Sequence, residues 1–299
     1  MKVSKELIFL NLGIIFMSTS GIFGRLISIK PELAIFYRCL LAAIMLFLFI
    51  RIRKLPYKNI VKDDKRFILL GGGLLAFHWV TYFYALSIHS IAIAILTLHT
   101  FPVMTAIFEP LILKTKFHSY HLLLAILVMI GIWIILPSFD IGDKLVLATL
   151  FGIVSALSYA LRNIWTKKVM SRYNGSVMMF YQVFIAMVVL SPYLFFYDSH
   201  FTTNDWIFIP CLAFVTTVLG HTLLVSSLKH YSAVTVSLIS CIIPIYGVLW
   251  GVIFINEIPN SKTIIGGSLI LLSFIVESYF SQRNYNLKKS IIINTKDLS

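Results

Sequence analysis

Residues 99–113 read HTFPVMTAIFEPLIL, and residues 241–255 read CIIPIYGVLWGVIFI. Both stretches are apolar, and each places a proline, Pro102 or Pro244, inside what should be a membrane-spanning helix. A proline removes one backbone hydrogen bond and kinks the helix that contains it. Two apolar stretches that share this feature raise the question whether the chain contains one membrane unit twice.

The composition is that of a polytopic membrane protein. Of the 299 residues, 59% are hydrophobic and 12% are charged, against roughly 25% charged residues in average soluble domains. The three cysteines, Cys39, Cys211 and Cys241, lie in apolar runs and show neither a disulfide framework nor the spacing of metal ligands. We therefore expect no metal and no cofactor.

The chain contains ten apolar runs of the length that a spanning helix needs, about 20 residues. Because every backbone polar group in lipid must be bonded internally, we expect an all-α helix bundle. The runs are 7–27, 32–50, 67–88, 91–113, 119–137, 145–166, 176–197, 205–228, 232–255 and 262–280. The first run is longer than the core of a signal peptide and has no cleavage site, so we expect it to be a span.

Lys and Arg residues in the connections predict the orientation of these spans. If the N-terminus is cytoplasmic, 19 of the 25 lie on the cytoplasmic side and three on the other, while Arg25, Arg38 and Arg162 lie within runs. This bias predicts a multi-pass protein of the cell (inner) membrane with both termini in the cytoplasm. It also explains the net charge of +13 without a nucleic-acid partner.

An internal repeat appears when the sequence is aligned with itself so that Ser90 falls on Ser232, an offset that we call the repeat shift. The same shift matches Leu96 with Leu238, Pro102 with Pro244, Ser119 with Ser261 and Leu127 with Leu269. We therefore predict two repeats of five spans, 1–137 and 138–280, and a short basic cytoplasmic tail, 281–299. Because five is odd, the second repeat enters the membrane with the opposite orientation. Such inverted repeats are typical of secondary transporters, which bind substrate near the midplane between the repeats.

Four stretches resemble the drug/metabolite transporter superfamily, in its EamA group of ten-span exporters. They are FYRCLLAA (36–43), HWVTYFYALSIHSIAIA (78–94), LATLFGIVSALSYALRNIWTKK (147–168) and LVSSLKHYSAVTVSLISCIIPIYGVLWGVIFINEIPNSKTIIGGSLIL (224–271). The resemblance covers about 7–280 and implies a gradient-coupled exporter of small metabolites, often amino acids. The chain departs from the pattern after span 4, where many relatives carry a glycine-glutamate pair. Here that loop reads LKTKFHS, and the glutamate lies earlier, at Glu109.

Ionisable side chains inside spans are candidates for function, because they are costly in lipid unless paired or hydrated. Arg38 in span 2 either binds a substrate carboxylate or pairs structurally near the outer face. In span 3, His78 and Trp79 begin a polar aromatic face, and Tyr82, four residues after His78, shares a side with it. This polar aromatic face either lines the substrate cavity or joins neighbouring helices.

His99, Pro102, Ala106 and Glu109 are spaced by 3, 4 and 3 residues, so they form one stripe on span 4. His99 lies near the midplane and is a candidate for substrate binding and proton coupling. Glu109 is a second proton-coupling candidate. Alternatively, Glu109 reaches the interface or pairs with Arg162 or a lysine.

Four polar residues complete the candidate substrate site: Gln182, His221, Ser240 and Tyr246. Gln182 occupies the position that Arg38 has in the first repeat. Ser240 belongs to a face of small residues on span 9, which indicates either a cavity wall or close helix packing. Pro102 and Pro244 are predicted to kink spans 4 and 9.

The sequence therefore favours a secondary active transporter that works by alternating access on a small-molecule substrate. A channel or facilitator for organic solutes is the first alternative. An intramembrane enzyme is the second, but the spans contain no H-E-x-x-H motif and no paired aspartates. Apart from substrate and lipid, we expect no partner, and a monomer or a weak homodimer.

Overall fold

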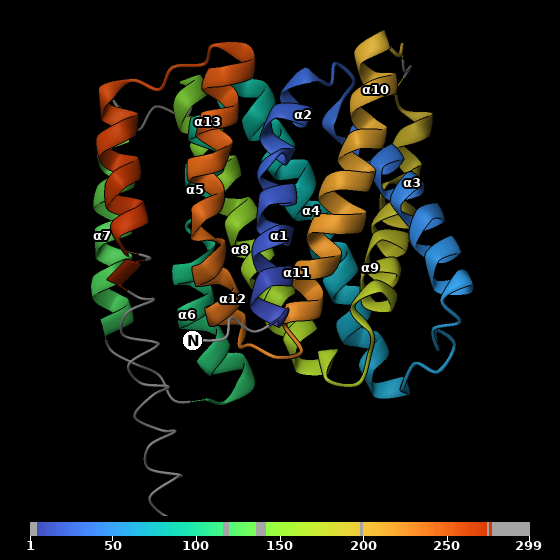
Figure 1. Ribbon diagram of the computed structural model, residues 1–299. Helices are drawn as coiled ribbons and strands as arrows, with labels where there is room; N and C mark the ends of the chain where they lie inside the picture. Colours follow the sequence, from blue (N-terminus) through green and yellow to red (C-terminus); the bar gives the residue numbers. More distant parts are fainter. Residues whose placement is uncertain (1–4, 116–119, 136–141, 198–199, 274, 277–299) are drawn as a thin grey trace, which may run out of the picture.

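The computed structural model describes residues 5–115, 120–135, 142–197, 200–273 and 275–276. Over these residues the fold is a bundle of helices without strands. This confirms the predicted all-α polytopic membrane fold. Figure 1 shows the helices running roughly side by side between two ends.

The first five predicted spans correspond to α1 (Lys5–Ser18) with α2 (Ser20–Leu26), α3 (Pro31–Ile52), η1 (Lys62–Asp64) with α4 (Lys65–Ile88), α5 (Ile91–Leu98) with α6 (Phe101–Leu113), and α7 (Tyr120–Ile135). The next four are α8 (Lys144–Met170), α9 (Gly175–Leu190) with η2 (Ser191–Phe195), α10 (Thr203–Cys211) with the π-helix η3 (Leu212–His221) and α11 (Thr222–Ser227), and α12 (Ala233–Ile239) with η4 (Ser240–Ile242) and α13 (Ile243–Ile255). A last helix covers Ser261–Ser273.

Eight of the helical segments in the described part of the chain are long and apolar enough to cross a membrane. They correspond to spans 1–4 and 6–9. The predicted fifth and tenth spans, 119–137 and 262–280, extend beyond the described residues, within which they form α7 and the helix Ser261–Ser273.

The two ends of the bundle differ in charge. We call the end formed by connections 53–64, 171–174 and 228–232 the basic end, and the end formed by connections 27–30 and 256–260 the distal end. In Figure 1 the basic end lies at the bottom and the distal end at the top.

Side chains that cap helices explain several of the helix starts. The Ser90 hydroxyl accepts from the Ile93 N–H at the start of α5, and the Asp143 carboxylate accepts from the Leu145 N–H at the start of α8. Such caps replace bonds that the first turn of a helix cannot make internally. Thr202 caps α10 in a capping box with Asp205.

Spans 4 and 9 are interrupted, where the sequence predicted a kink. Span 4 breaks between α5 and α6, with Pro102 in the first turn of α6. Span 9 breaks at η4, with Pro244 in the first turn of α13. The first turn has no internal bond for a proline to remove, so proline begins a new segment there at little cost. Each proline therefore follows the break and marks the start of the second segment.

The two broken spans also end alike. α6 ends at Lys114 with φ 55°, and α13 ends at Asn256 with φ 54°. The repeat shift that aligns the two prolines also places Lys114 on Asn256.

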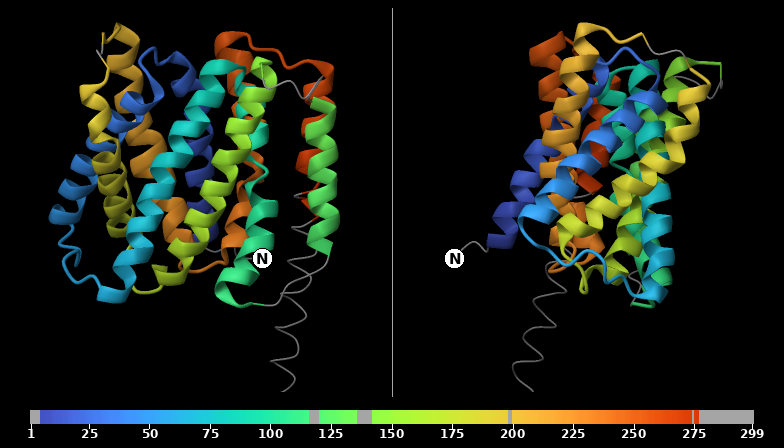
Figure 2. Two further views of the ribbon diagram at one scale, coloured as in Figure 1. Left: turned by 180° about the vertical axis from the view of Figure 1, so that it is seen from behind. Right: turned by 90° about the vertical axis from the view of Figure 1, so that its right-hand side faces the viewer.

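Two helices lie at one edge of the bundle. Figures 1 and 2 show α7 beside the final helix Ser261–Ser273 at this edge, and buried side chains such as Leu124 and Ile270 join them to Val103 of the neighbouring α6. Their backbones approach at Gly131 and Gly266, where an added Cβ on Gly266 would lie 2.4 Å from the Gly131 carbonyl oxygen. The remaining helices pack closely in pairs, among them α4 against α8, α3 against α9, and α1 against η3.

Large apolar side chains are exposed on the outside of the bundle, and several charged and polar side chains are buried inside it, where they are shielded from lipid. Phe195 and Trp206 are exposed, whereas Arg38, Arg162 and Gln182 are fully buried. Polar chemistry is therefore concentrated in the interior, where it surrounds a small cavity.

Candidate functional site

A cavity of about 40 Å³ lies in the interior of the bundle. A water needs roughly 10–15 Å³ of such volume, so the cavity has room for a few waters but is too small for an organic solute in this conformation. It is lined by Met17, Ser20, His78, Trp79, Tyr82, Ile95, Leu98, His99, Phe101, Tyr159, His221 and Ile243. Five of the nine predicted substrate-binding residues line it: His78, Trp79, Tyr82, His99 and His221.

His78 connects spans 3 and 6 at the cavity. Its ring stacks on Tyr159 with centroids 4.4 Å apart and on Tyr82 at 6.4 Å. Its Nδ1 lies 2.8 Å from the Ser155 hydroxyl of α8. The predicted shared side of His78 and Tyr82 is therefore present, and α8 supplies the third ring.

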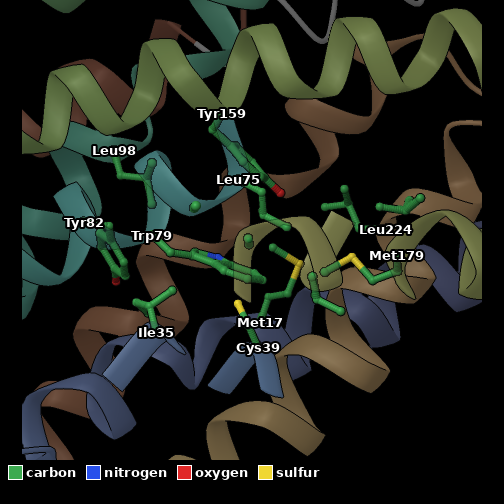
Figure 3. Close-up of a cluster of buried hydrophobic side chains, with 14 of the residues drawn as sticks. Met17, Ile35, Cys39, Leu75, Trp79, Tyr82, Leu98, Tyr159, Met179 and Leu224 are labelled. Atoms are coloured by element: carbon green, nitrogen blue, oxygen red, sulfur yellow. The ribbon is translucent and has the colours of Figure 1, made fainter. Parts of the chain in front are cut away.

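Trp79 separates Arg38 from the cavity. Figure 3 shows Trp79 among Tyr82, Tyr159 and Met17 in the buried hydrophobic cluster. The Arg38 guanidinium carbon lies 3.8 Å from the centroid of the Trp79 ring, a cation–π contact. The indole edge contacts His221, with ring centroids 5.2 Å apart.

Arg38 turns into the bundle and does not reach towards the membrane surface. Its Nε donates to the Thr217 hydroxyl at 2.7 Å, and its Nη2 donates to the Thr216 hydroxyl at 2.9 Å. Its Nη1 is buried and has no hydrogen-bond partner among the described residues. Both threonines belong to η3, and π-helical segments are frequent at functional sites.

His99 lies at the break between α5 and α6. Its Nδ1 is 2.7 Å from the carbonyl oxygen of Ile95, one turn earlier at the end of α5. Its Nε2 is buried without a partner in the described part of the chain, and the ring lines the cavity. A histidine at this point both caps the end of α5 and presents a nitrogen to the cavity.

Glu109 lies at the basic end and not at the cavity. Its two oxygens accept from the backbone N–H groups of Ala233 and Val234 at 3.3 and 2.9 Å, at the start of α12. At the same end, the Asp64 carboxylate accepts from Arg172 Nε at 2.8 Å. The predicted stripe on span 4 is therefore divided between two sites.

The distal end carries a similar set of bonds. Glu257 accepts from Arg25 Nε at 3.0 Å and from the Ile91 N–H at 2.7 Å, at the start of α5. Asp205 accepts from the N–H and the hydroxyl of Ser28 at 2.7 and 2.6 Å. At both ends, each carboxylate reaches from one half of the chain to the other.

Four of the predicted substrate-binding residues do not line the cavity. Arg38 lies behind Trp79. Gln182 is buried beside Arg162, whose Nε donates to the Gln182 carbonyl oxygen at 2.9 Å. The Ser240 hydroxyl donates to the Val236 carbonyl within span 9. Tyr246 is half-buried on α13.

Tyr159 lines the cavity but was not among the predicted substrate-binding residues, and Arg162, which the sequence placed within span 6, lies near it on the same helix. They lie three residues apart on α8, so they share one face. The guanidinium carbon of Arg162 lies 5.9 Å from the centroid of the Tyr159 ring. The available signal was an arginine within a span, the same signal that made Arg38 a candidate, with an aromatic residue three positions before it.

Comparisons with known proteins agree with this architecture. Residues 4–136 and 146–279 match the EamA-like transporter family. The chain is 25% identical over 248 residues to the pseudopaline exporter CntI of Pseudomonas aeruginosa, covering 82% of this chain and 84% of that protein. It is 23% identical over 268 residues to an uncharacterized transporter of Archaeoglobus fulgidus, covering 89% and 93%.

A solved crystal structure shares the fold. It superposes with a TM-score of 0.72 at 15% sequence identity, covering 93% of this chain and 98% of the other. At that identity the likeness concerns the fold alone.

Proposed function

We propose that this chain, which belongs to the EamA-like transporter family, is a secondary active exporter of small metabolites such as amino acids. Family membership and the names of the relatives make it a multi-pass membrane transporter rather than an enzyme. The proposal adds the mechanism, which is alternating access between two inverted repeats, 1–137 and 138–280.

One observation carries this proposal: bonds at the two ends of the bundle are related by the repeat shift. At the distal end, Arg25 Nη1 donates to the Leu86 carbonyl at 2.9 Å. At the basic end, Lys167 Nζ donates to the Leu228 carbonyl at 2.8 Å. The repeat shift places Arg25 on Lys167 and Leu86 on Leu228. Equivalent residues thus make equivalent bonds at opposite ends, as inverted repeats should.

The carboxylates extend this relation across the two halves. Glu257 binds the N-terminus of α5 at Ile91, and Glu109 binds the N-terminus of α12 at Ala233. The two helix starts are related by the repeat shift, although the glutamates themselves are not. A carboxylate is stabilised at the N-terminus of a helix by the positive end of the helix dipole.

Two aspartates repeat the pattern. Asp64 precedes α4 and binds Arg172 in the connection after α8. Asp205 lies at the start of α10 and binds Ser28 in the connection after α2. The aspartates, and likewise their partners, are separated in sequence by nearly the repeat shift. Each end of the bundle is thus closed by two carboxylates that bridge the halves.

Such bridges suit a protein that opens at one end at a time. The Arg25–Glu257 pair is partly exposed, and exposed ion pairs contribute only about 0–1 kcal/mol. Breaking the bonds at one end leaves those at the other intact. The halves then tilt apart at one end and expose the central cavity to one side of the membrane.

We place the substrate-binding site in the central cavity. Its histidines and aromatic rings offer flat apolar surface together with polar atoms, which suits small polar metabolites. The export direction is supported by the name of the relative that exports pseudopaline. We place the basic end in the cytoplasm, from the Lys and Arg bias, in a monomer or weak homodimer of the cell (inner) membrane.

Counterflow in liposomes tests the proposal. Purified protein in vesicles preloaded with one member of a panel of amino acids and organic acids should accelerate uptake of the same labelled compound. Protein-free vesicles are the control. A channel would show uptake without acceleration by preloading, and the absence of exchange across the panel would refute a transporter of such metabolites.

A further inference from the structure

Two arginines lie in the interior of the bundle without a carboxylate. Arg38 and Arg162 are both fully buried. Among the described residues, neither has an Asp or Glu oxygen within 4.0 Å. A buried charge that lacks a counter-charge is strongly destabilising, so buried guanidinium groups are normally paired.

The nearest carboxylate in sequence does not fill this need. Glu32 lies on α3 nearly two turns from Arg38, and its Oε1 accepts from the Tyr84 hydroxyl at 2.5 Å. The carboxylates of the two ends bind backbone groups, Arg25, Arg172 and Ser28, as described above. No carboxylate among the described residues therefore supplies a counter-charge to the two arginines of the interior.

The two arginines lie on opposite sides of the cavity along the bundle. Arg38 is seven residues into α3 from the distal end, about 10 Å at 1.5 Å per residue. Arg162 is eight residues before the end of α8 at the basic end, about 12 Å. Trp79 and Tyr159, the two rings that these guanidinium groups face, both line the cavity.

Unpartnered nitrogens point to a ligand at the same place. Arg38 Nη1, His99 Nε2 and His221 Nδ1 are all buried and have no hydrogen-bond partner within the described ranges. Arginine has donors only, so Arg38 Nη1 suits an anionic group. His99 Nδ1 donates to the Ile95 carbonyl oxygen, so Nε2 of the neutral ring accepts a hydrogen bond, for example from a ligand hydroxyl. Buried polar atoms are normally satisfied, so unpartnered nitrogens of His99 and His221 in the cavity lining, and of Arg38 behind Trp79, indicate groups that a ligand completes.

Gln182 indicates what kind of group Arg162 accepts. Its amide oxygen accepts from both Nε and Nη2 of Arg162, the same edge of the guanidinium that a carboxylate binds with its two oxygens. A neutral amide oxygen thus occupies the position that a carboxylate oxygen would take, and a carboxylate would bind there more strongly.

We propose that the substrate is a small organic anion with two acidic groups, one bound by Arg38 and the other by Arg162. This rests on the proposed function and narrows it. The acidic groups take the free Nη1 of Arg38 and replace Gln182 at Arg162, while the rest of the molecule lies against Trp79 and Tyr159. The cavity must widen before such a molecule fits, which agrees with a closed conformation between two open ones.

Ligand-induced stabilisation of the purified protein tests the proposal independently of transport. A ligand that binds the folded state raises the unfolding temperature to an extent that grows with its concentration relative to its Kd. Linear dicarboxylates from malonate to adipate are compared at equal sodium concentration, with sodium chloride as the reference. The best of them is then compared with its monoamide and its diamide, which carry one and no negative charge.

We expect stabilisation to fall from the dicarboxylate to the monoamide and to vanish with the diamide. Arg38→Gln and Arg162→Gln should each weaken the apparent affinity at least about tenfold, as loss of one partner of a buried charge pair does. Arg66→Gln removes a cation from an exposed position and should change nothing. If an arginine variant does not fold, the comparison of dicarboxylate, monoamide and diamide on the unmodified protein still tests the proposal.

Equal stabilisation by the dicarboxylate and its monoamide, or any stabilisation by the diamide, would overturn the proposal. Unchanged affinity in Arg38→Gln would do the same. If a dicarboxylate binds but shows no counterflow, the transport function fails and this site assignment stands. If neutral solutes exchange and no dicarboxylate binds, the assignment fails and the transport function stands.

Discussion

His99 and Glu109 show how two residues of one stretch acquire different tasks. His99 lies where α5 ends, so its ring caps that helix and faces the cavity. Glu109 lies further along α6 and binds the start of α12. Since both Glu109 oxygens are occupied by backbone N–H groups, we favour a structural task for Glu109 over proton coupling, which stays a prediction for His99.

Glu109→Gln tests this assignment. The amide loses the negative charge at the α12 N-terminus, worth about 0.3–1 kcal/mol and up to about 2 when partly buried. We expect a lower unfolding temperature and an unchanged dependence of exchange on a pH gradient. Glu257→Gln is the matched variant at the distal end. Loss of pH-driven exchange in a stable Glu109→Gln protein would instead assign proton coupling to this carboxylate.

His89 makes the distal end sensitive to pH. Burial lowers the pKa of His89 below its usual 6.5, and Arg25 lowers it further, although Asp143 and Glu257 act in the opposite direction. A lowered pKa means that the folded protein resists protonation of His89. The stability that neutral His89 provides is therefore complete above about pH 6.5 and is lost as the pH falls below it.

Unfolding temperatures measured from pH 7.5 to pH 5.5 check this effect. We expect the decrease to be smaller in His89→Gln than in the unmodified protein. His230→Gln, at an exposed position of the basic end, serves as the control. An identical decrease in His89→Gln would show that other groups cause the pH dependence.

At the scale of the elements, hydropathy predicts where helices lie but not where they break. The spans follow from runs of about 20 apolar residues, a signal that depends on composition alone. The breaks at 99–100 and 240–242 depend on which side chains bond the carbonyl groups beside them, which only the folded structure defines. The prolines predicted the approximate position of each break, because a proline can start a new helical segment as well as kink a continuous helix.

The contact between α7 and the final helix gives a test at this scale. Gly266→Ala would place its Cβ against the Gly131 carbonyl oxygen, and backbone cannot move aside as a side chain can. We expect a loss of about 1–3 kcal/mol of stability, as for other overpacked contacts. Gly73→Ala is the matched control, since nothing described lies within 4 Å of its Cβ and helix propensity favours alanine by about 1 kcal/mol. If both variants have the same unfolding temperature, the close approach of the two helices is wrong.

The candidate site was predictable in part. Histidines inside spans are conspicuous because they are polar, and His78, His99 and His221 converge on the cavity together with the predicted Trp79 and Tyr82. Tyr159 was missed because an aromatic residue in an apolar run looks like packing. The sequence identified Arg38 as an ionisable residue inside a span. Its position behind Trp79 depends on its bonds to η3, whose π-helical geometry the sequence does not reveal.

At the scale of the whole molecule, the account depends on the two halves being inverted copies that close the bundle at both ends. The repeat shift aligns the two prolines and also Lys114 with Asn256, the two helix ends with positive φ. It further aligns the backbone bond of Arg25 with that of Lys167. Two inverted repeats of five spans predict such equivalent features at opposite ends. The bridging carboxylates do not follow from the repeat, since Glu109 and Glu257 are not equivalent in sequence.

Distances between spin labels at the two ends test alternating access most directly. In a protein lacking Cys39, Cys211 and Cys241, one pair of labels is placed on the exposed Lys30 and Ile258 at the distal end. A second pair is placed on the exposed Thr115 and His230 at the basic end.

The account predicts that the two distances change in opposite senses. Glu257→Gln should lengthen the distal distance and shorten the basic one, and Glu109→Gln should do the reverse. If both distances lengthen together, or if neither variant moves either pair, alternating access by the two halves is contradicted.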